Sequence, residues 1–212
     1  MQEIVIGSIP LLASFIISAI RYSKLKPSIL RFFPWFLGFT FCIQIAGYYY
    51  SYLFKKSNHF IFNIFTLVAY TFYFQLIFHN LWRPRLKQAT LAMGLIFICV
   101  YVYEIFLAGS FFVYNSIAVD TGDFLVLAGC LMYLSELLMA EQTINCFKVP
   151  MFWIFTGIMF ANIGNFLYLS FFNYILKNDL DPEGAIYGVI STVTSVVEYS
   201  FFIIGFLIPA NE

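Results

Sequence analysis

Residues 184–209 have the sequence GAIYGVISTVTSVVEYSFFIIGFLIP, an apolar run in which Glu198 is the only charged side chain. A helix needs roughly 20 mostly apolar residues to cross the hydrocarbon core of a membrane. Only a helix can satisfy every backbone N–H and C=O group of a single segment surrounded by lipid. The stretch therefore predicts a transmembrane helix that carries a carboxyl group near its middle.

Six further apolar segments precede this one. With it they give seven predicted helices, at residues 4–20, 32–54, 60–78, 89–109, 124–140, 150–176 and 184–209. Hydrophobic residues make up 62% of the 212 residues and charged residues only 10%, against roughly 25% charged residues in soluble domains. We expect an all-α, polytopic seven-helix bundle that forms a single transmembrane domain over residues 1–212. Met1-Gln2-Glu3 lacks the positive stretch of a secretory signal, so we expect the first segment to remain as a helix.

The basic residues divide unevenly between the two sides of the predicted membrane. One side holds Arg21, Lys24, Lys26, Arg31, Arg83, Arg85, Lys87 and Lys148, whereas the other holds only Lys55, Lys56 and Lys177. Cytoplasmic loops carry the excess of lysine and arginine in membrane proteins. The distribution predicts an N-terminus outside and a C-terminus in the cytoplasm. The predicted outer loops are acidic, with Asp120, Asp123, Asp179, Asp181 and Glu183, and the zero net charge gives no sign of nucleic-acid binding.

A faint internal duplication links the two ends of the chain. The opening of the second helix, PWFLGFT at 34–40, matches PMFWIFT at 150–156, and VAYTFY at 68–73 matches VEYSFF at 197–202. A parallel three-plus-one-plus-three repeat, with the fourth helix as connector, would explain both pairs. Chance similarity in a chain with 28 Phe would explain them equally well.

Glu198 is the strongest candidate for a functional group, because ionisable residues at membrane depth are costly and often functional. Tyr187, Ser191 and Ser195 precede it at helical spacing and form one polar stripe with it. No lysine or arginine lies inside any of the seven segments. The carboxyl group could bind a proton, a cation or a ligand amine. A neutral carboxylic acid that joins two helices by a hydrogen bond is the structural alternative. Glu136, near the inner end of its segment, is interpreted as interfacial.

A second polar cluster is predicted in the outer half of the bundle. Its members are amide, phenol and carboxyl side chains at similar depth on four helices: Gln44, Tyr48, Asn63, Tyr101, Glu104, Asn162 and Asn165. Convergent polar groups in an aromatic-lined interior are typical of a small-molecule site. Hydrogen bonds between helices are the alternative explanation. Gly157 and Ala161, four residues apart, are typical of a close helix-packing face.

Sequence signatures of an enzyme, a metal site or a cofactor were sought and not found. No GxSxG, HExxH, P-loop or dinucleotide motif occurs, and His59 and His79 fall at segment ends on opposite sides of the membrane. We therefore expect neither catalysis nor a bound metal or cofactor. A rhodopsin-like seven-helix protein is also disfavoured, because residues 184–209 hold no lysine to bind retinal.

Two families resemble the chain. The three-plus-one-plus-three plan is similar to that of SWEET-type sugar transporters. Pro10, Pro34 and Pro150 loosely match the helix-breaking prolines of that family, although no Pro-Gln pair occurs. The stretches NHFIFNIF at 58–65 and PMFWI at 150–154, together with Glu198-Tyr199, resemble small seven-helix proteins of Bacteroidota. That group tends to have an acidic residue where this chain has Ala69.

The Bacteroidota resemblance implies a sensor module in a bacterial inner membrane. Such a receptor would bind a small or lipophilic ligand within the bundle. Because no soluble domain is expected here, it would signal through a separate cytoplasmic protein. A small-solute transporter or channel coupled to protons or cations through Glu198 is the alternative function, and a membrane scaffold subunit is a third.

Overall fold

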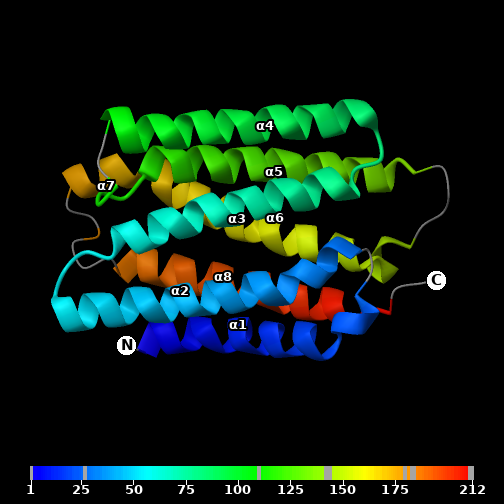
Figure 1. The fold of residues 1–212 in the computed structure, drawn as a ribbon, viewed down its shortest axis with the longest axis horizontal. Coiled ribbons are helices and arrows are strands. Elements are labelled where there is room, and N and C mark those ends of the chain that lie inside the picture. The colour runs from blue at the N-terminus through cyan, green and yellow to red at the C-terminus, as the bar shows by residue number, and fades with distance from the viewer. Residues whose placement is uncertain are drawn as a thin grey trace.

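The computed structural model describes residues 2–25, 28–108, 111–140, 145–178, 181 and 185–209. Within these ranges the chain is helical and contains no strand. The helices are α1 (Gln2–Ile20), α2 (Phe33–Phe54), α3 (His59–Asn80), α4 (Pro84–Tyr103), α5 (Ser116–Leu138), α6 (Pro150–Ser170), the short α7 (Phe172–Lys177) and α8 (Ala185–Leu207). Consecutive long helices run in opposite directions, so that α1 begins at one end of the bundle and α8 finishes at the other (Figure 1).

The expected all-α fold is confirmed over the described residues. Of the seven expected membrane-spanning helices, six are long and apolar enough within these residues to cross a membrane. They are Ile29–Phe54, His59–Asn80, Pro84–Phe106, Ser116–Leu138, Pro150–Tyr168 and Ala185–Leu207. The apolar part of α1, Ser8–Ile20, is shorter than these six helices.

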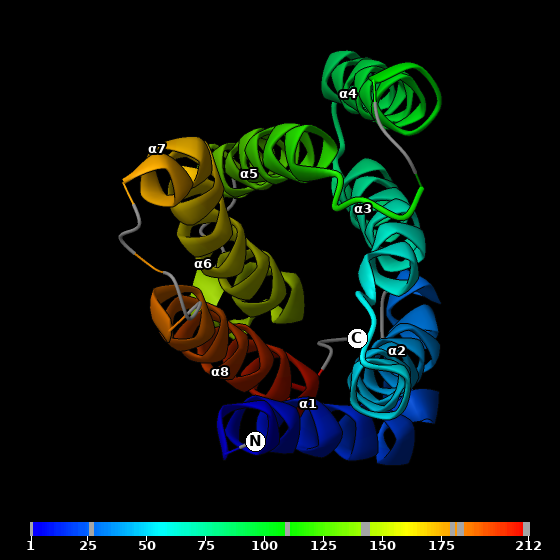
Figure 2. The same cartoon turned by 90° about the vertical axis from the view of Figure 1, so that its left-hand side faces the viewer.

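The helices form a ring with one helix outside it. Viewed along the helix axes, α1, α2, α3, α5, α6 and α8 follow one another around the ring, and α4 packs outside against α3 and α5 (Figure 2). Helix α4 joins α3 to α5 from outside the ring. The ring itself is closed by direct packing of α3 on α5 and of α1 on α8.

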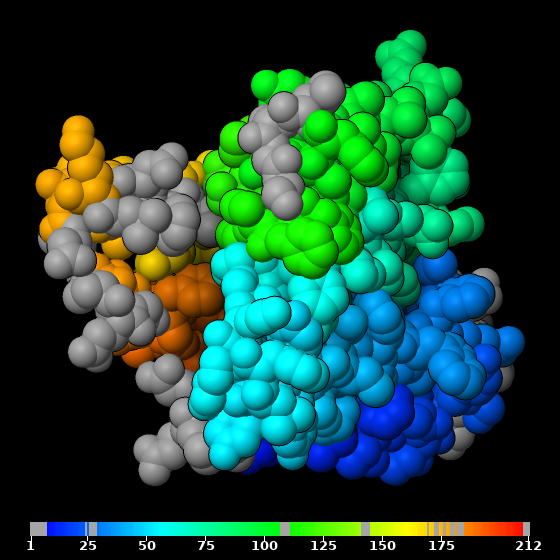
Figure 3. All heavy atoms as spheres, turned by 60° about the vertical axis from the view of Figure 1, so that its left-hand side comes forward, coloured from blue at the N-terminus to red at the C-terminus, as the bar shows by residue number. Residues whose placement is uncertain are grey.

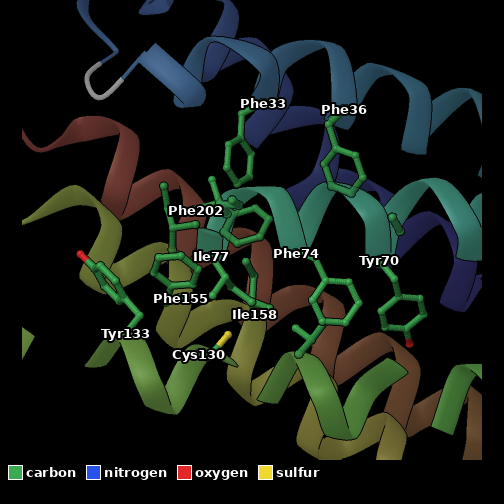
Figure 4. Close-up of a cluster of buried hydrophobic side chains, with 14 of the residues drawn as sticks. Phe33, Phe36, Tyr70, Phe74, Ile77, Cys130, Tyr133, Phe155, Ile158 and Phe202 are labelled. Atoms are coloured by element: carbon green, nitrogen blue, oxygen red, sulfur yellow. The ribbon is translucent and has the colours of Figure 1, made fainter. Parts of the chain in front are cut away.

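Aromatic side chains fill the ring where α2 begins and α8 ends. Phe33 is fully buried, and its ring centroid lies 5.1 Å from that of Phe72, 5.3 Å from Phe202 and 5.4 Å from Phe206. Edge-to-face contacts of this kind are favourable beyond the apolar area that they bury. Figure 4 shows Phe33, Phe202 and further side chains of α3, α5 and α6 within this shared interior.

Several helix boundaries differ from those expected. Helix α4 begins at Pro84, not at residue 89, so Arg85 and Lys87 lie on this helix rather than in a loop. Helix α5 begins at Ser116, not at residue 124, so Asp120 and Asp123 lie on a membrane helix rather than in an outer loop. The segment expected at 150–176 is divided, because α6 ends at Ser170 and the short α7 follows. Asp179 and Glu183, two of the expected outer acidic residues, lie outside the described residues.

Candidate functional site

Two hydrogen bonds between a phenol and a carboxyl group lie inside the ring. The Tyr70 hydroxyl donates to Asp123 Oδ1 at 2.5 Å, and the Tyr73 hydroxyl donates to Glu198 Oε1 at 3.0 Å. Asp123 is 2% exposed and Glu198 is 8% exposed. We call these four residues the acid–phenol centre.

The centre connects three helices. Tyr70 and Tyr73 are three residues apart on α3 and therefore lie on the same face, with their ring centroids 6.4 Å apart. Asp123 comes from α5 and Glu198 from α8. The face of α3 that carries these two phenols is thus bonded to two different helices of the ring.

No cationic side chain accompanies these carboxyl groups from the surrounding helices. The sequences of α1, α2, α3, α5, α6 and α8 contain no lysine or arginine. A buried carboxylate without a countercharge is unfavourable, so such a group either holds a proton or binds a positive ligand. Proton exchange and cation or amine binding are therefore the chemistry available to the centre.

The polar stripe on α8 leads from the start of that helix toward the acid–phenol centre. Tyr187 is 42% exposed, and its ring lies 5.1 Å from that of Tyr168 on α6. Ser191 and Ser195 are half-buried on the same stripe, and Glu198 is buried. The stripe thus runs from an exposed phenol to a buried acid.

Asn63 and Tyr101, two members of the expected outer cluster, are joined by a hydrogen bond. The Tyr101 hydroxyl donates to the backbone carbonyl oxygen of Asn63 at 3.0 Å. The Asn63 side chain donates to the carbonyl oxygens of Phe111 and Val113, at 2.9 and 2.8 Å, and accepts from the Asn115 N–H at 3.3 Å. These bonds fasten the segment before α5 to the start of α3, where the two are in contact at the surface (Figure 3).

Glu104 holds the first turn of α5. It follows the last residue of α4, is 8% exposed, and accepts hydrogen bonds from the backbone N–H groups of Ile117 at 3.1 Å and Ala118 at 2.6 Å. A carboxylate at a helix N-terminus satisfies free N–H groups and interacts favourably with the helix dipole. Its contacts are those of a helix cap rather than of a ligand site.

The other members of the expected cluster lie apart from these bonds. Gln44 and Tyr48 are half-buried on α2, and the Tyr48 ring lies 6.2 Å from that of Tyr52. The buried Asn162 side chain donates to a carbonyl oxygen of its own helix at 2.6 Å, and Asn165 is half-buried. Among the described residues, no hydrogen bond joins these four to Asn63, Tyr101 or Glu104.

A groove of about 750 Å³ lies elsewhere, between α1 and α2. Its lining is almost entirely apolar: Phe15, Ala19, Tyr22, Pro34, Trp35, Gly38, Phe39, Phe41 and Cys42. None of the candidate site residues lines it. A groove of this kind fits lipid chains better than a polar ligand.

Asp181 holds the first turn of α8 in the same way that Glu104 holds α5. Its carboxylate accepts from the N–H groups of Ile186 and Tyr187, both at 3.0 Å, and from the Tyr168 hydroxyl at 3.1 Å. Desolvation raises the pKa of this carboxyl group, but the backbone and hydroxyl hydrogen bonds outweigh it and leave the pKa below its ordinary value.

We expect the stabilising effect of Asp181 to disappear in acid. A carboxyl group whose pKa is lowered by folding stabilises the fold above its ordinary pKa of about 3.9, and this contribution is lost as the pH falls through the lowered value. The wild type should have a higher Tm than Asp181→Asn at pH 7, and the gap should close toward pH 3. A gap that stays constant across this range would contradict the ionised cap.

No family model, curated protein or solved structure matches this chain. Within the described residues, no group of three or more His, Cys, Asp or Glu side chains is placed to hold a metal ion. The interpretation of the site therefore depends on its own geometry.

Proposed function

We propose that this protein is a receptor-like membrane sensor that binds a small ligand at the acid–phenol centre. The observation that carries the proposal is that both hydrogen bonds of the centre attach α3, one to α5 and one to α8. A ligand that takes over either carboxyl group would release a tyrosine of α3. Binding would then change how α3 packs in the ring.

The ligand would enter from the outer side. The excess of lysine and arginine at the other end of the bundle supports an N-terminus outside and a C-terminus in the cytoplasm. The stripe of Tyr187, Ser191 and Ser195 offers a polar route from the outer end to Glu198. The aromatic packing around Phe33 fills the inner half of the ring, which favours a ligand that binds from outside and leaves by the same side.

A rearrangement of α3 would reach the cytoplasmic surface directly. The residues that follow α3, Trp82 and Arg83, bind Glu136 of α5 through their backbone N–H groups, at 2.7 and 2.6 Å. Arg83 begins a short basic stretch with Arg85 and Lys87. We propose this stretch as the contact for a cytoplasmic signalling partner. The resemblance to sensor-like seven-helix proteins of Bacteroidota agrees with this role and with a bacterial inner membrane.

The proposal predicts a ligand-dependent gain in stability that requires Glu198. A ligand that binds the folded state raises the Tm in proportion to the logarithm of its concentration over Kd. In a panel of small amines, alcohols and lipophilic acids, we expect at least one compound to raise the wild-type Tm in detergent or nanodiscs. The shift should be about 3 °C or more, and Glu198→Gln should lose most of it.

Asp120→Asn is the matched control for this experiment. Asp120 is also an acid within a membrane helix, but its carboxylate accepts from the Ser170 hydroxyl at 3.2 Å in an exposed position. The control should keep the full ligand shift. A broad panel that never changes the wild-type Tm, or a shift that Glu198→Gln retains in full, would count against ligand binding at the centre.

Coupled transport is the second candidate function, and the order of the helices around the ring favours it. If α1, α2 and α3 are matched with α5, α6 and α8, each neighbouring pair in one half corresponds to a neighbouring pair in the other. The two contacts that close the ring, α3 with α5 and α1 with α8, also correspond. This order supports the three-plus-one-plus-three repeat, with α4 as connector. Solute flux into sealed proteoliposomes would distinguish a carrier from a sensor.

A further inference from the structure

One oxygen atom of the acid–phenol centre has no partner. Asp123 Oδ1 accepts the hydrogen bond from Tyr70, whereas Oδ2 is buried without any hydrogen-bond partner. The side chain is 2% exposed. Buried polar atoms in folded proteins are nearly always satisfied, and an orphaned carboxylate oxygen is among the costliest exceptions. This oxygen is therefore the point at which a positive ligand would be most strongly held.

Oxygen atoms that could serve as ligands of a cation lie close to Asp123. The Tyr70 hydroxyl, which binds Asp123, also lies 3.2 Å from the carbonyl oxygen of Val119 one helical turn earlier. Carboxylate, carbonyl and hydroxyl oxygens are the ligands that hard cations prefer.

The charge and size of the surroundings favour a small monovalent ion. Among the described residues, no group of three or more His, Cys, Asp or Glu side chains is placed to hold a metal ion, so the strongly charged set that a divalent ion favours is not complete. Asp123 is too deeply buried for a bulky organic cation to reach it without opening the ring.

We propose that Asp123 binds one sodium ion between α3 and α5, with Asp123 Oδ2 as its principal ligand and the Tyr70 hydroxyl as a neighbouring ligand. This inference goes beyond the proposed sensory function, because the ion is distinct from the sensed ligand. The ion would compensate the buried charge of Asp123 and connect α5 to α3. It would therefore stabilise the closed arrangement of the helices.

Sodium binding can be measured on the purified full-length chain. The protein is prepared in choline chloride at pH 8, and its Tm is followed as NaCl replaces choline chloride at constant ionic strength. We expect a rise of about 5 °C at saturation, with a smaller rise in KCl. Binding of radioactive sodium to the wild-type protein, competed by unlabelled NaCl, gives a second readout that needs no variant.

Variants identify the ligand atoms. Asp123→Asn keeps the shape of the side chain and an oxygen for Tyr70, and it should lose the sodium-dependent rise. Tyr70→Phe keeps both carboxyl groups and should weaken sodium binding about tenfold. Asp181→Asn, at the start of α8 and outside the acid–phenol centre, should keep the full sodium-dependent rise. If Asp123→Asn cannot be purified, Tyr70→Phe and radioactive sodium still decide the question.

Two outcomes would overturn the proposal. The first is a wild-type Tm that is the same in sodium and choline, with no saturable binding of radioactive sodium. The second is that Asp123 holds a proton instead of a sodium ion. The Tm would then respond to pH between 6 and 8, independently of sodium, and Asp123→Asn would abolish that response. The titratable groups that face Asp123 are Tyr70 and Tyr73 of α3, Asp120 of α5, Tyr187 and Glu198 of α8, and Tyr114 before α5. Either outcome leaves the ligand experiment on Glu198 as a separate test of the sensory function.

Discussion

Glu136→Ala is expected to lower the free energy of unfolding by about 3 kcal/mol. The Glu136 side chain is 4% exposed, and its two carboxylate oxygens accept the backbone N–H groups of Trp82 at 2.7 Å and Arg83 at 2.6 Å. Alanine would leave both donors at the start of α4 without a partner and would open a polar cavity. The loss is measured as a fall in the Tm of the purified protein in detergent.

Arg83→Ala provides the matched control for Glu136→Ala. The Arg83 Nε atom lies 3.9 Å from Glu136 Oε1, and the arginine side chain is 61% exposed. An exposed ion pair contributes about 0–1 kcal/mol, and the substitution keeps the backbone N–H group that Glu136 accepts. Its Tm should therefore stay close to that of the wild type. Equal losses in the two variants would show that the ion pair, not the backbone hydrogen bonds, stabilises this end of α4.

Glu136 and Glu104 together explain why α4 stays attached outside the ring. Glu104, at the end of α4, accepts N–H groups from the first turn of α5, and Glu136, near the end of α5, accepts those that precede α4. The two antiparallel helices are thus connected at both ends by a buried carboxyl group. In lipid, where apolar burial between helices adds little, such hydrogen bonds carry more of the association.

The fold was largely predictable, because the length and apolarity of a segment are enough to identify a membrane helix. Segment 32–54 corresponds to α2, 60–78 to α3 and 184–209 to α8, each within a few residues. The predicted start of α5 is wrong, because acidic residues such as Asp120 and Asp123 indicate an aqueous loop when only the sequence is considered. In the structure each has a hydroxyl partner, Ser170 for Asp120 and Tyr70 for Asp123. Partners of this kind come from distant positions in the sequence and leave no local pattern.

The candidate site could be predicted only in part. Glu198 stood out because it is the single charge in its segment, and the structure places it in the interior of the bundle. Its partner Tyr73 belongs to the VAYTFY motif of α3 and could not be identified as such, since nothing in the sequence places α3 opposite α8. Asn63 and Glu104 were selected as polar groups at similar depth. Their partners are backbone groups of residues 111–118, which no composition or spacing can indicate.

Glu136 shows the same limit at the end of the bundle where α5 finishes. Its position near the end of a helix suggested an interfacial carboxylate in contact with water. It is instead buried, because the chain between α3 and α4 turns its N–H groups toward it. Depth along a helix can be read from a sequence, but burial depends on which neighbouring backbone lies across from the side chain.

Gly157→Leu is expected to destabilise the protein by about 3 kcal/mol, because α6 and α8 approach each other closely at this residue. A Cβ atom at position 157 would lie 2.9 Å from the Phe201 Cβ atom and 3.0 Å from the backbone carbonyl oxygen of Glu198. Neither atom can move without moving α8. The two helices would have to separate, and this displacement would carry Glu198 away from Tyr73.

Gly94→Ala is the matched control, because a Cβ atom there meets only Phe74 on α3, at an ordinary distance of 3.8 Å. Alanine also favours a helix by about 1 kcal/mol over glycine, so this variant should match or slightly exceed the wild-type Tm. Gly157→Leu should lower the Tm sharply and also reduce any ligand-dependent shift, because that shift depends on the position of Glu198. If Gly157→Leu unfolded at the wild-type temperature and kept that shift, α6 and α8 would not be in close contact here, and the rigid placement of Glu198 inside the ring would have to be abandoned.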